Sequence, residues 1–117
     1  MENKKSTGMM EKDLKIISEF KKRFPVEIRN HVKKVIVFGS RARGEFTEES
    51  DLDAIVLLDE KTPEVEKQLD EIAYSVMWDY DFKPIVSLKV FAEEQFKKGV
   101  EKGYSFYRHV EREGISV

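Results

Sequence analysis

The most constraining feature of the chain is a short apolar run that ends abruptly in Gly39 and Ser40. After ten intervening residues, a pair of aspartates, Asp51 and Asp53, opens a second apolar run. Both runs are rich in β-branched residues and bounded by turn residues, which is typical of buried strands. The glycine lets the backbone turn sharply and approach a ligand closely, and a short helix can begin at the serine. Because the first N–H groups of a helix are free, we expect this turn to suit an anion.

Asp51 and Asp53 form the second half of the pattern. Because side chains alternate along a strand, both carboxylates project on the same side, roughly 6.6 Å apart along the chain at about 3.3 Å per residue. Two carboxylates on one face repel each other and are costly to bury without a cation. Mg²⁺ prefers hard oxygen ligands and commonly binds one or two carboxylates together with substrate phosphates. A phosphate-binding turn beside a metal site indicates phosphoryl or nucleotidyl transfer.

Each part of this pattern has an ordinary structural explanation when it is taken alone. A Gly-Ser turn is most often only a turn, and an Asp-x-Asp pair at a strand start is most often a cap or a solvated edge. Arg41 and Arg43, which follow the turn, would by themselves be surface charge. The order strand, Gly-Ser turn, ten residues, Asp-x-Asp, strand is what favours one shared site.

This combination resembles the signature of the nucleotidyltransferase superfamily that includes DNA polymerase beta. The run Gly-Ser-Arg-Ala-Arg-Gly at 39–44 resembles more specifically the minimal nucleotidyltransferases. These are small proteins often paired with HEPN-domain partners in toxin–antitoxin modules. The motif covers residues 35–58, and the expected order of elements is compatible with the family over roughly residues 10–115.

The resemblance implies the nucleotidyltransferase fold, an α/β (α+β) arrangement in which a small mixed β-sheet is flanked by helices. It also implies that Asp51 and Asp53 bind Mg²⁺, the cofactor of the reaction. The same two acids, together with Ser40, would be the catalytic residues.

The resemblance further implies where a nucleoside triphosphate, ATP foremost, is bound. The Gly39 backbone and Ser40 would hold its β- and γ-phosphates. Arg41 or Arg43 would neutralise charge on the leaving pyrophosphate, and the sequence leaves open which of them does so. A hydroxyl group would attack the α-phosphorus, so that the product carries a nucleoside monophosphate such as AMP. The acceptor implied by the family is a HEPN-domain protein, which the enzyme would modify as its antitoxin.

The chain departs from the family pattern on the third strand. Active members usually carry a third acid there, beside the Asp pair, where it holds a second metal and helps deprotonate the nucleophile. Here the middle of that strand offers Ser87 and Lys89. Asp79 and Asp81 precede the strand, and Asp81 is the candidate to replace the missing carboxylate.

Two functions therefore compete. The first is an active transferase that places AMP or another nucleotide on a partner protein. The second is a nucleotidyltransferase-fold protein that has lost turnover and acts by binding its HEPN partner. Nucleotidylation of an antibiotic is a third reading, but such enzymes usually carry an extra domain for the acceptor.

Hydrophobic periodicity and turn residues predict the elements of the chain. In chain order these are helices at 10–24 and 26–32, strands at 34–38 and 52–58, a long helix at 63–80, a strand at 85–91, helices at 92–98 and 104–113, and an extended end at 115–117. Trp78 is expected to pack in the core rather than to stack on a base. The aromatic residues near the C-terminus either close the core or form an apolar patch that a partner or second copy covers.

The composition bounds partners and compartment. A chain of 117 residues is expected to form a single domain at 10–117, preceded by a disordered segment at 1–9. Both signs of charge are mixed, with a net charge of −2, so nucleic-acid binding is not expected. The lack of cysteine and of any apolar run of membrane-spanning length favours a cytoplasmic protein with no membrane contact. So small a domain has little room for an acceptor pocket, so we expect a second chain, either a HEPN partner or another copy.

Overall fold

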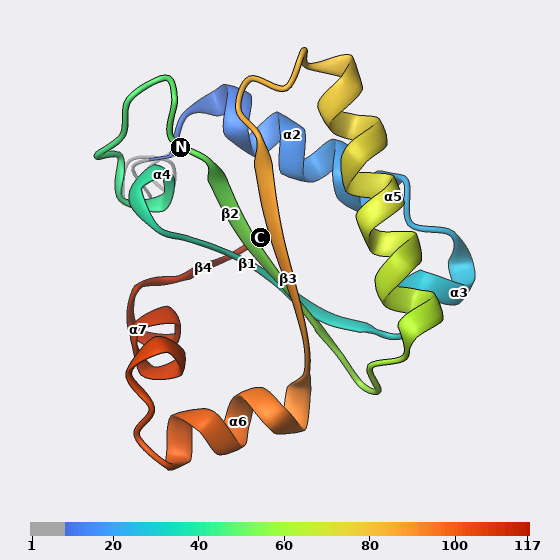
Figure 1. Ribbon diagram of the computed structural model, residues 1–117, viewed down its shortest axis with the longest axis vertical. Helices are drawn as coiled ribbons and strands as arrows, with labels where there is room; N and C mark the ends of the chain where they lie inside the picture. Colours follow the sequence, from blue (N-terminus) through green and yellow to red (C-terminus); the bar gives the residue numbers. More distant parts are fainter. Residues whose placement is uncertain (1–8) are drawn as a thin grey trace.

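A four-stranded mixed sheet with the strand order β3-β2-β1-β4 organises the computed structural model of the chain (Figure 1). β1 (Val32–Phe38) pairs antiparallel with β2 (Leu52–Leu58) and, on its other side, with the short β4 (Ile115–Ser116). β2 pairs in parallel with β3 (Val86–Ala92). The prediction of a small mixed sheet flanked by helices is therefore confirmed.

The structure describes residues 9–117. The segment expected to be disordered, 1–9, lies outside the described residues except for Met9. The Met9 side chain is buried against the core, so the packed part of the chain includes this residue.

Six helices cover the sheet within the described part of the chain. They are α2 (Glu11–Lys22), α3 (Val26–Arg29), α4 (Ser40–Arg43), α5 (Pro63–Asp79), α6 (Glu93–Glu101) and α7 (Ser105–Glu113). The long helix α5 begins as expected, because the Thr62 side chain accepts a hydrogen bond from the Val65 N–H and Pro63 stands in the first turn. Among residues 9–117, none of these helices combines the length and the apolarity that crossing a bilayer requires.

The two faces of the sheet are covered unequally. Figure 1 shows α2, α3 and α5 on one side and α6 and α7 on the other. The first side carries the larger core, to which alternate residues of β2 such as Ala54 and Val56 contribute. The second side carries a smaller cluster around Ile36, Ile55 and Phe96. Because β2 is central and faces a core on both sides, its sequence is apolar almost throughout rather than alternating.

Two predicted elements differ from the structure by three residues at a boundary, and the others differ by at most two. The helix expected at 26–32 ends at Arg29, because Val32 already pairs with Leu58 in the sheet. The helix expected at 92–98 begins at Glu93 and continues to Glu101, because Ala92 is still paired in β3. Val32 and Ala92 are therefore paired in strands, although local periodicity predicts that they belong to helices.

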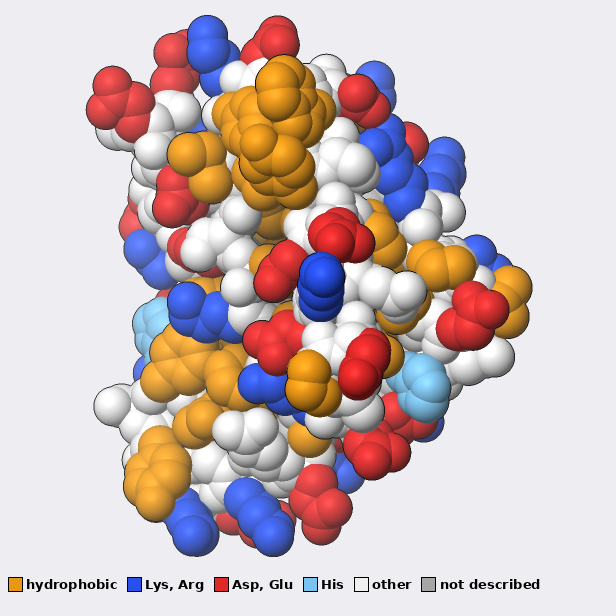
Figure 2. All heavy atoms as spheres, turned by 45° about the vertical axis from the view of Figure 1, so that its right-hand side comes forward, with side chains coloured by type: hydrophobic (Ala, Val, Ile, Leu, Met, Phe, Trp, Pro, Cys, Tyr) orange, Lys and Arg blue, Asp and Glu red, His pale blue; other side chains and the backbone are white. Residues whose placement is uncertain are grey.

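The prediction that Trp78 packs in the core is wrong. Its side chain is 61% exposed, because the buried face of α5 runs through Leu69, Ala73 and Val76. Trp78 instead contacts Tyr74 and Phe82 edge to face. Figure 2 shows hydrophobic side chains gathered on the surface at the top of the view, over the end of α5.

The aromatic residues near the C-terminus partly close the core. Tyr107 packs against Phe91 and Phe96, under the face of the sheet that α6 and α7 cover. Tyr104 and Phe106 remain partly exposed at 55% and 38%. Tyr107 therefore closes part of the core, whereas the covering of the exposed residues by a partner or second copy stays a prediction.

Candidate active site

The turn after β1 lies directly against the second aspartate. Gly39 has a φ of +82° and a ψ of −165°, a conformation that side chains rarely tolerate, and α4 begins at the next residue, Ser40. A Cβ atom built on Gly39 would lie 2.5 Å from the Asp53 Oδ2 atom. Strand pairing explains this approach, because Asp53 stands opposite Phe38, the last residue of β1. The structure therefore brings the Gly-Ser turn and the Asp pair to one place.

Gly39→Ala is expected to lower the free energy of unfolding by about 1–3 kcal/mol, since the left-handed backbone becomes strained. It should also weaken binding of a magnesium–nucleotide complex, because the added methyl group displaces the Asp53 carboxylate. Urea denaturation measures the first effect, and calorimetry with a non-hydrolysable ATP analogue measures the second.

The matched control is Gly103→Ala. Gly103 also has a positive φ, of +80°, but a Cβ atom there would meet nothing closer than an Arg108 nitrogen at 3.7 Å. This variant should be destabilised by strain while its nucleotide affinity stays unchanged. Wild-type nucleotide affinity in Gly39→Ala would contradict the close packing of turn and carboxylate.

Asp51 and Asp53 sit at the start of β2 with different burial. Asp53 is half-buried and Asp51 is exposed. Burial raises the pKa of Asp53, and the negative charge of Asp51 raises it further, while Lys89 opposes both. The two carboxylates therefore lie close enough to repel each other, and a bound cation would relieve that repulsion.

The donor set fits Mg²⁺. Two carboxylates supply the hard oxygen ligands that this ion prefers, and substrate phosphates commonly complete its coordination. Within residues 9–117, no cluster of three or more histidine, cysteine or acidic side chains is placed to hold a metal ion. A magnesium ion here would thus depend on Asp51, Asp53 and the nucleotide itself.

Asp53→Asn is expected to raise the free energy of unfolding at neutral pH when divalent cations are removed by a chelator. The pKa of Asp53 is higher in the folded than in the unfolded protein, so the charged carboxylate opposes folding. The wild-type protein is therefore most stable below the unfolded-state pKa of this group and loses stability as the pH rises through the folded-state pKa. The advantage of the variant should therefore shrink in urea denaturation at acid pH, where both forms are uncharged. Lower stability of the variant in chelator at neutral pH would contradict the repulsion between the two acids.

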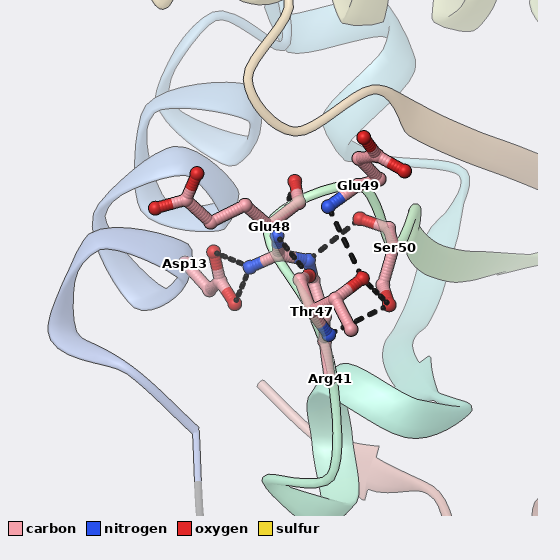
Figure 3. A network of polar contacts seen from close by, with 6 residues as sticks. All are labelled: Asp13, Arg41, Thr47, Glu48, Glu49 and Ser50. Carbon is pink, nitrogen blue, oxygen red and sulfur yellow. Dashed lines mark hydrogen bonds and ion pairs between the residues drawn. The ribbon is translucent and has the colours of Figure 1, made fainter.

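Arg41 does not lie at the carboxylate pair. Its guanidinium is buried and donates to both carboxylate oxygens of Asp13 on α2, at 3.2 and 3.0 Å (Figure 3). Its Nε atom donates to the Ser50 carbonyl at 2.8 Å, and the guanidinium lies over the Phe46 ring. Further contacts at 3.4 Å reach the carbonyls of Thr47 and Glu48.

These contacts give Arg41 a structural role. It ties the loop at 44–51, which connects the Gly-Ser turn to the Asp pair, down onto α2. The expectation that Arg41 binds phosphate is not supported by this placement, since its donors are directed at Asp13 and at loop carbonyls. Arg43 is the more available of the two, with a side chain 40% exposed and a 3.3 Å contact to Glu45.

Asp13 is the residue that sequence reasoning missed. It is fully buried, although it lies on a helix whose exposed face is rich in charge. The sequence spacing does indicate that Asp13 is buried. Asp13 precedes Ile16 and Ile17 by three and four residues, so it lies on the same apolar face of the helix. An acid on the apolar face of a helix requires a buried cationic partner, and Arg41 is that partner.

Asp81, the candidate for a third carboxylate, is not brought beside the pair by strand pairing. It lies exposed in the turn after α5, and Ser87 is the residue of β3 that stands opposite Asp53. Asp79 forms an ion pair with Arg23 of the segment after α2. The structure therefore shows Asp53 flanked by the backbone of the turn on one strand and by a serine on the other.

A cavity of about 620 Å³ opens beside the first acid. It lies between the start of α2, the loop at 44–51 and the segment at 82–85, and Asp51 is part of its lining. Lys12, Lys83 and Glu49 also reach it, so its wall carries both signs of charge. Of the two acids of the pair, Asp51 alone is in the lining of this cavity.

Comparison with known proteins agrees with this geometry. A family model described as a nucleotidyltransferase domain matches residues 14–109. The chain belongs to the nucleotidyltransferase family, as the Gly-Ser and Asp-x-Asp motifs predicted, and is an enzyme of this class.

Two curated relatives come from Methanocaldococcus jannaschii. "Putative protein adenylyltransferase MJ0141" is 36% identical over 107 residues, which cover 89% of this chain and 97% of the relative. "Putative protein adenylyltransferase MJ0604" is 34% identical over 100 residues, which cover 86% of this chain and 92% of the relative. The match over nearly the full length of both relatives is consistent with a minimal nucleotidyltransferase.

Proposed function

We propose that this protein transfers AMP from ATP to a hydroxyl group of a partner protein. The observation that carries the proposal is the close approach of the Gly39 backbone to the Asp53 carboxylate, with Asp51 beside it. In this arrangement a turn suited to binding phosphate lies next to two acids suited to binding a metal ion. The names of the two relatives support protein as the acceptor and AMP as the transferred group.

In the proposed reaction the acceptor oxygen attacks the α-phosphorus of ATP. The new bond joins that oxygen to phosphorus, the bond to the β-phosphate oxygen breaks, pyrophosphate leaves, and the hydroxyl proton passes to solvent. Asp51 and Asp53 would hold Mg²⁺, Gly39 and Ser40 would bind the β- and γ-phosphates, and Arg43 would offset charge on pyrophosphate. A magnesium ion held there would act as a Lewis acid and stabilise negative charge on phosphate oxygens. The protein contributes positioning of the triphosphate for in-line attack.

A HEPN-domain protein encoded beside this gene is the acceptor we propose. The test is incubation of both proteins with Mg²⁺ and ATP labelled either in the α- or in the γ-phosphate. Label from the α-position alone should become covalently attached to the partner. Label from the γ-position on the partner would instead indicate phosphoryl transfer and would contradict the proposal.

The second candidate is a protein that neutralises its partner by binding without turnover. The observation that favours it is the serine opposite Asp53, on the strand where active family members usually carry an acid. If it is correct, a double variant Asp51→Asn, Asp53→Asn should still neutralise the partner. Loss of neutralisation in the double variant, with binding retained, would favour the enzyme.

A further inference from the structure

We propose that Lys89 binds a phosphate of the nucleotide and that the site uses a single divalent cation. This inference rests on the proposed function and deepens it, because it assigns a role to a residue of the strand from which a second metal would be held. The ammonium group would take over, as a fixed charge of the protein, part of the neutralisation that a second cation provides.

Strand register places Lys89 on the face of the Asp pair. In the parallel pairing of β2 with β3, Asp53 stands opposite Ser87 and Ile55 stands opposite Lys89. Paired residues point to the same side of a sheet, and so do residues two apart on one strand. Asp53, Ser87 and Lys89 therefore share one face of the sheet. Lys89 is the next residue of β3 on that face after Ser87, the partner of Asp53.

This end of the face is open. Asp53 and Ser87 are half-exposed and Lys89 is exposed, whereas Ile55, one pair further along β2, is fully buried. The cover of α6 and α7 thus ends short of the residues in question. A polyanionic ligand bound at the Gly-Ser turn can extend over this uncovered surface.

The positive charge of Lys89 acts on the Asp pair, and within the described residues it forms no ion pair. Among residues 9–117, no carboxylate lies within ion-pair distance of its ammonium group. Strand register places Lys89 on the face of Asp53, and its positive charge lowers the pKa of that carboxyl.

Lys89 would help to balance the negative charge of the bound triphosphate. One Mg²⁺ ion neutralises Asp51 and Asp53, which leaves the negative charge of the triphosphate to be balanced by other groups. Arg41 is engaged with Asp13, so it does not serve. Lys12 and Lys83 line the cavity beside Asp51. Lys89 differs from them because strand register places it on the face of Asp53. Lysine is a common phosphate ligand and acts as a point charge.

The test measures binding rather than turnover. Lys89→Met is expected to weaken the affinity for a magnesium complex of a non-hydrolysable ATP analogue about 10- to 100-fold, the range for losing a hydrogen bond to a charged group. Lys89→Arg should retain most of the affinity. Lys67→Met is the control, because Lys67 is exposed on α5, a helix that covers the opposite face of the sheet from Lys89. Unchanged affinity in Lys89→Met would overturn the inference.

The number of bound cations provides an independent readout. Electron paramagnetic resonance with Mn²⁺ and the same analogue should show one Mn²⁺ ion bound per wild-type chain. Two bound ions would overturn the single-cation site. Failure of this inference is distinguishable from failure of the proposed function, because AMP transfer that depends on Asp53 would persist while Lys89→Met binds normally.

Discussion

Asp53→Asn is expected to reduce AMP transfer to the partner protein by roughly 10³-fold or more. The loss follows from removal of a metal ligand that supplies several kcal/mol of transition-state stabilisation, with each 1.36 kcal/mol worth about tenfold in rate. The fold itself should survive, since Asp53 is only half-buried and carries an unfavourable charge in the absence of metal. Initial rates of label incorporation from α-labelled ATP measure the effect.

Asp81→Asn is the matched control for this substitution. Asp81 has a left-handed backbone with a φ of +56°, which asparagine also tolerates, and its side chain is exposed. Because strand pairing puts Ser87 rather than Asp81 beside Asp53, the rate of Asp81→Asn should stay within about twofold of wild type. A large loss in Asp81→Asn would restore this residue as the third carboxylate, and a normal rate in Asp53→Asn would exclude the proposed site.

Arg41→Met is expected to lower the free energy of unfolding by about 3–5 kcal/mol, because it leaves the Asp13 carboxylate buried without its partner. The substitution also removes the donors that hold the carbonyls of Ser50 and Thr47 in the connecting loop. Urea denaturation of the variant and the wild-type protein measures the difference. Nucleotide affinity should fall as well, since the loop carries the Asp pair at its end.

Two further variants isolate the buried pair. Asp13→Leu combined with Arg41→Met should recover part of the lost stability, because an apolar pair replaces an unpaired buried charge. Arg43→Met should change the free energy of unfolding by no more than about 0.5 kcal/mol, as expected for an exposed arginine. Equal effects of Arg41→Met and Arg43→Met would contradict the distinction between a structural and a ligand-facing arginine.

The strands, the turn and the family were readable from the sequence because each rests on local patterns. Apolar runs bounded by turn residues identify β1 and β2, and Gly39 marks the sharp reversal between β1 and α4. The spacing of the Asp pair follows from strand geometry alone. These features need no knowledge of how distant segments pack.

The sequence did not predict where some individual side chains lie, because their positions depend on contacts between residues far apart in the chain. Arg41 is separated by 28 residues from Asp13, so nothing local distinguishes it from Arg43. Trp78 is a different case, because it follows Leu69 by nine residues, about two and a half turns at 3.6 residues per turn, so helix spacing already places it opposite the buried face. The pairing of Asp53 with Ser87, by contrast, depends on the parallel register of β2 and β3.

The most direct test of a shared magnesium and triphosphate site is calorimetry with a non-hydrolysable ATP analogue. Wild-type protein should bind one molecule of the analogue per chain when Mg²⁺ is present, and a chelator or the Asp53→Asn substitution should abolish most of that binding. Equal affinity with and without Mg²⁺, or no binding in its presence, would contradict a site that the metal and the triphosphate share.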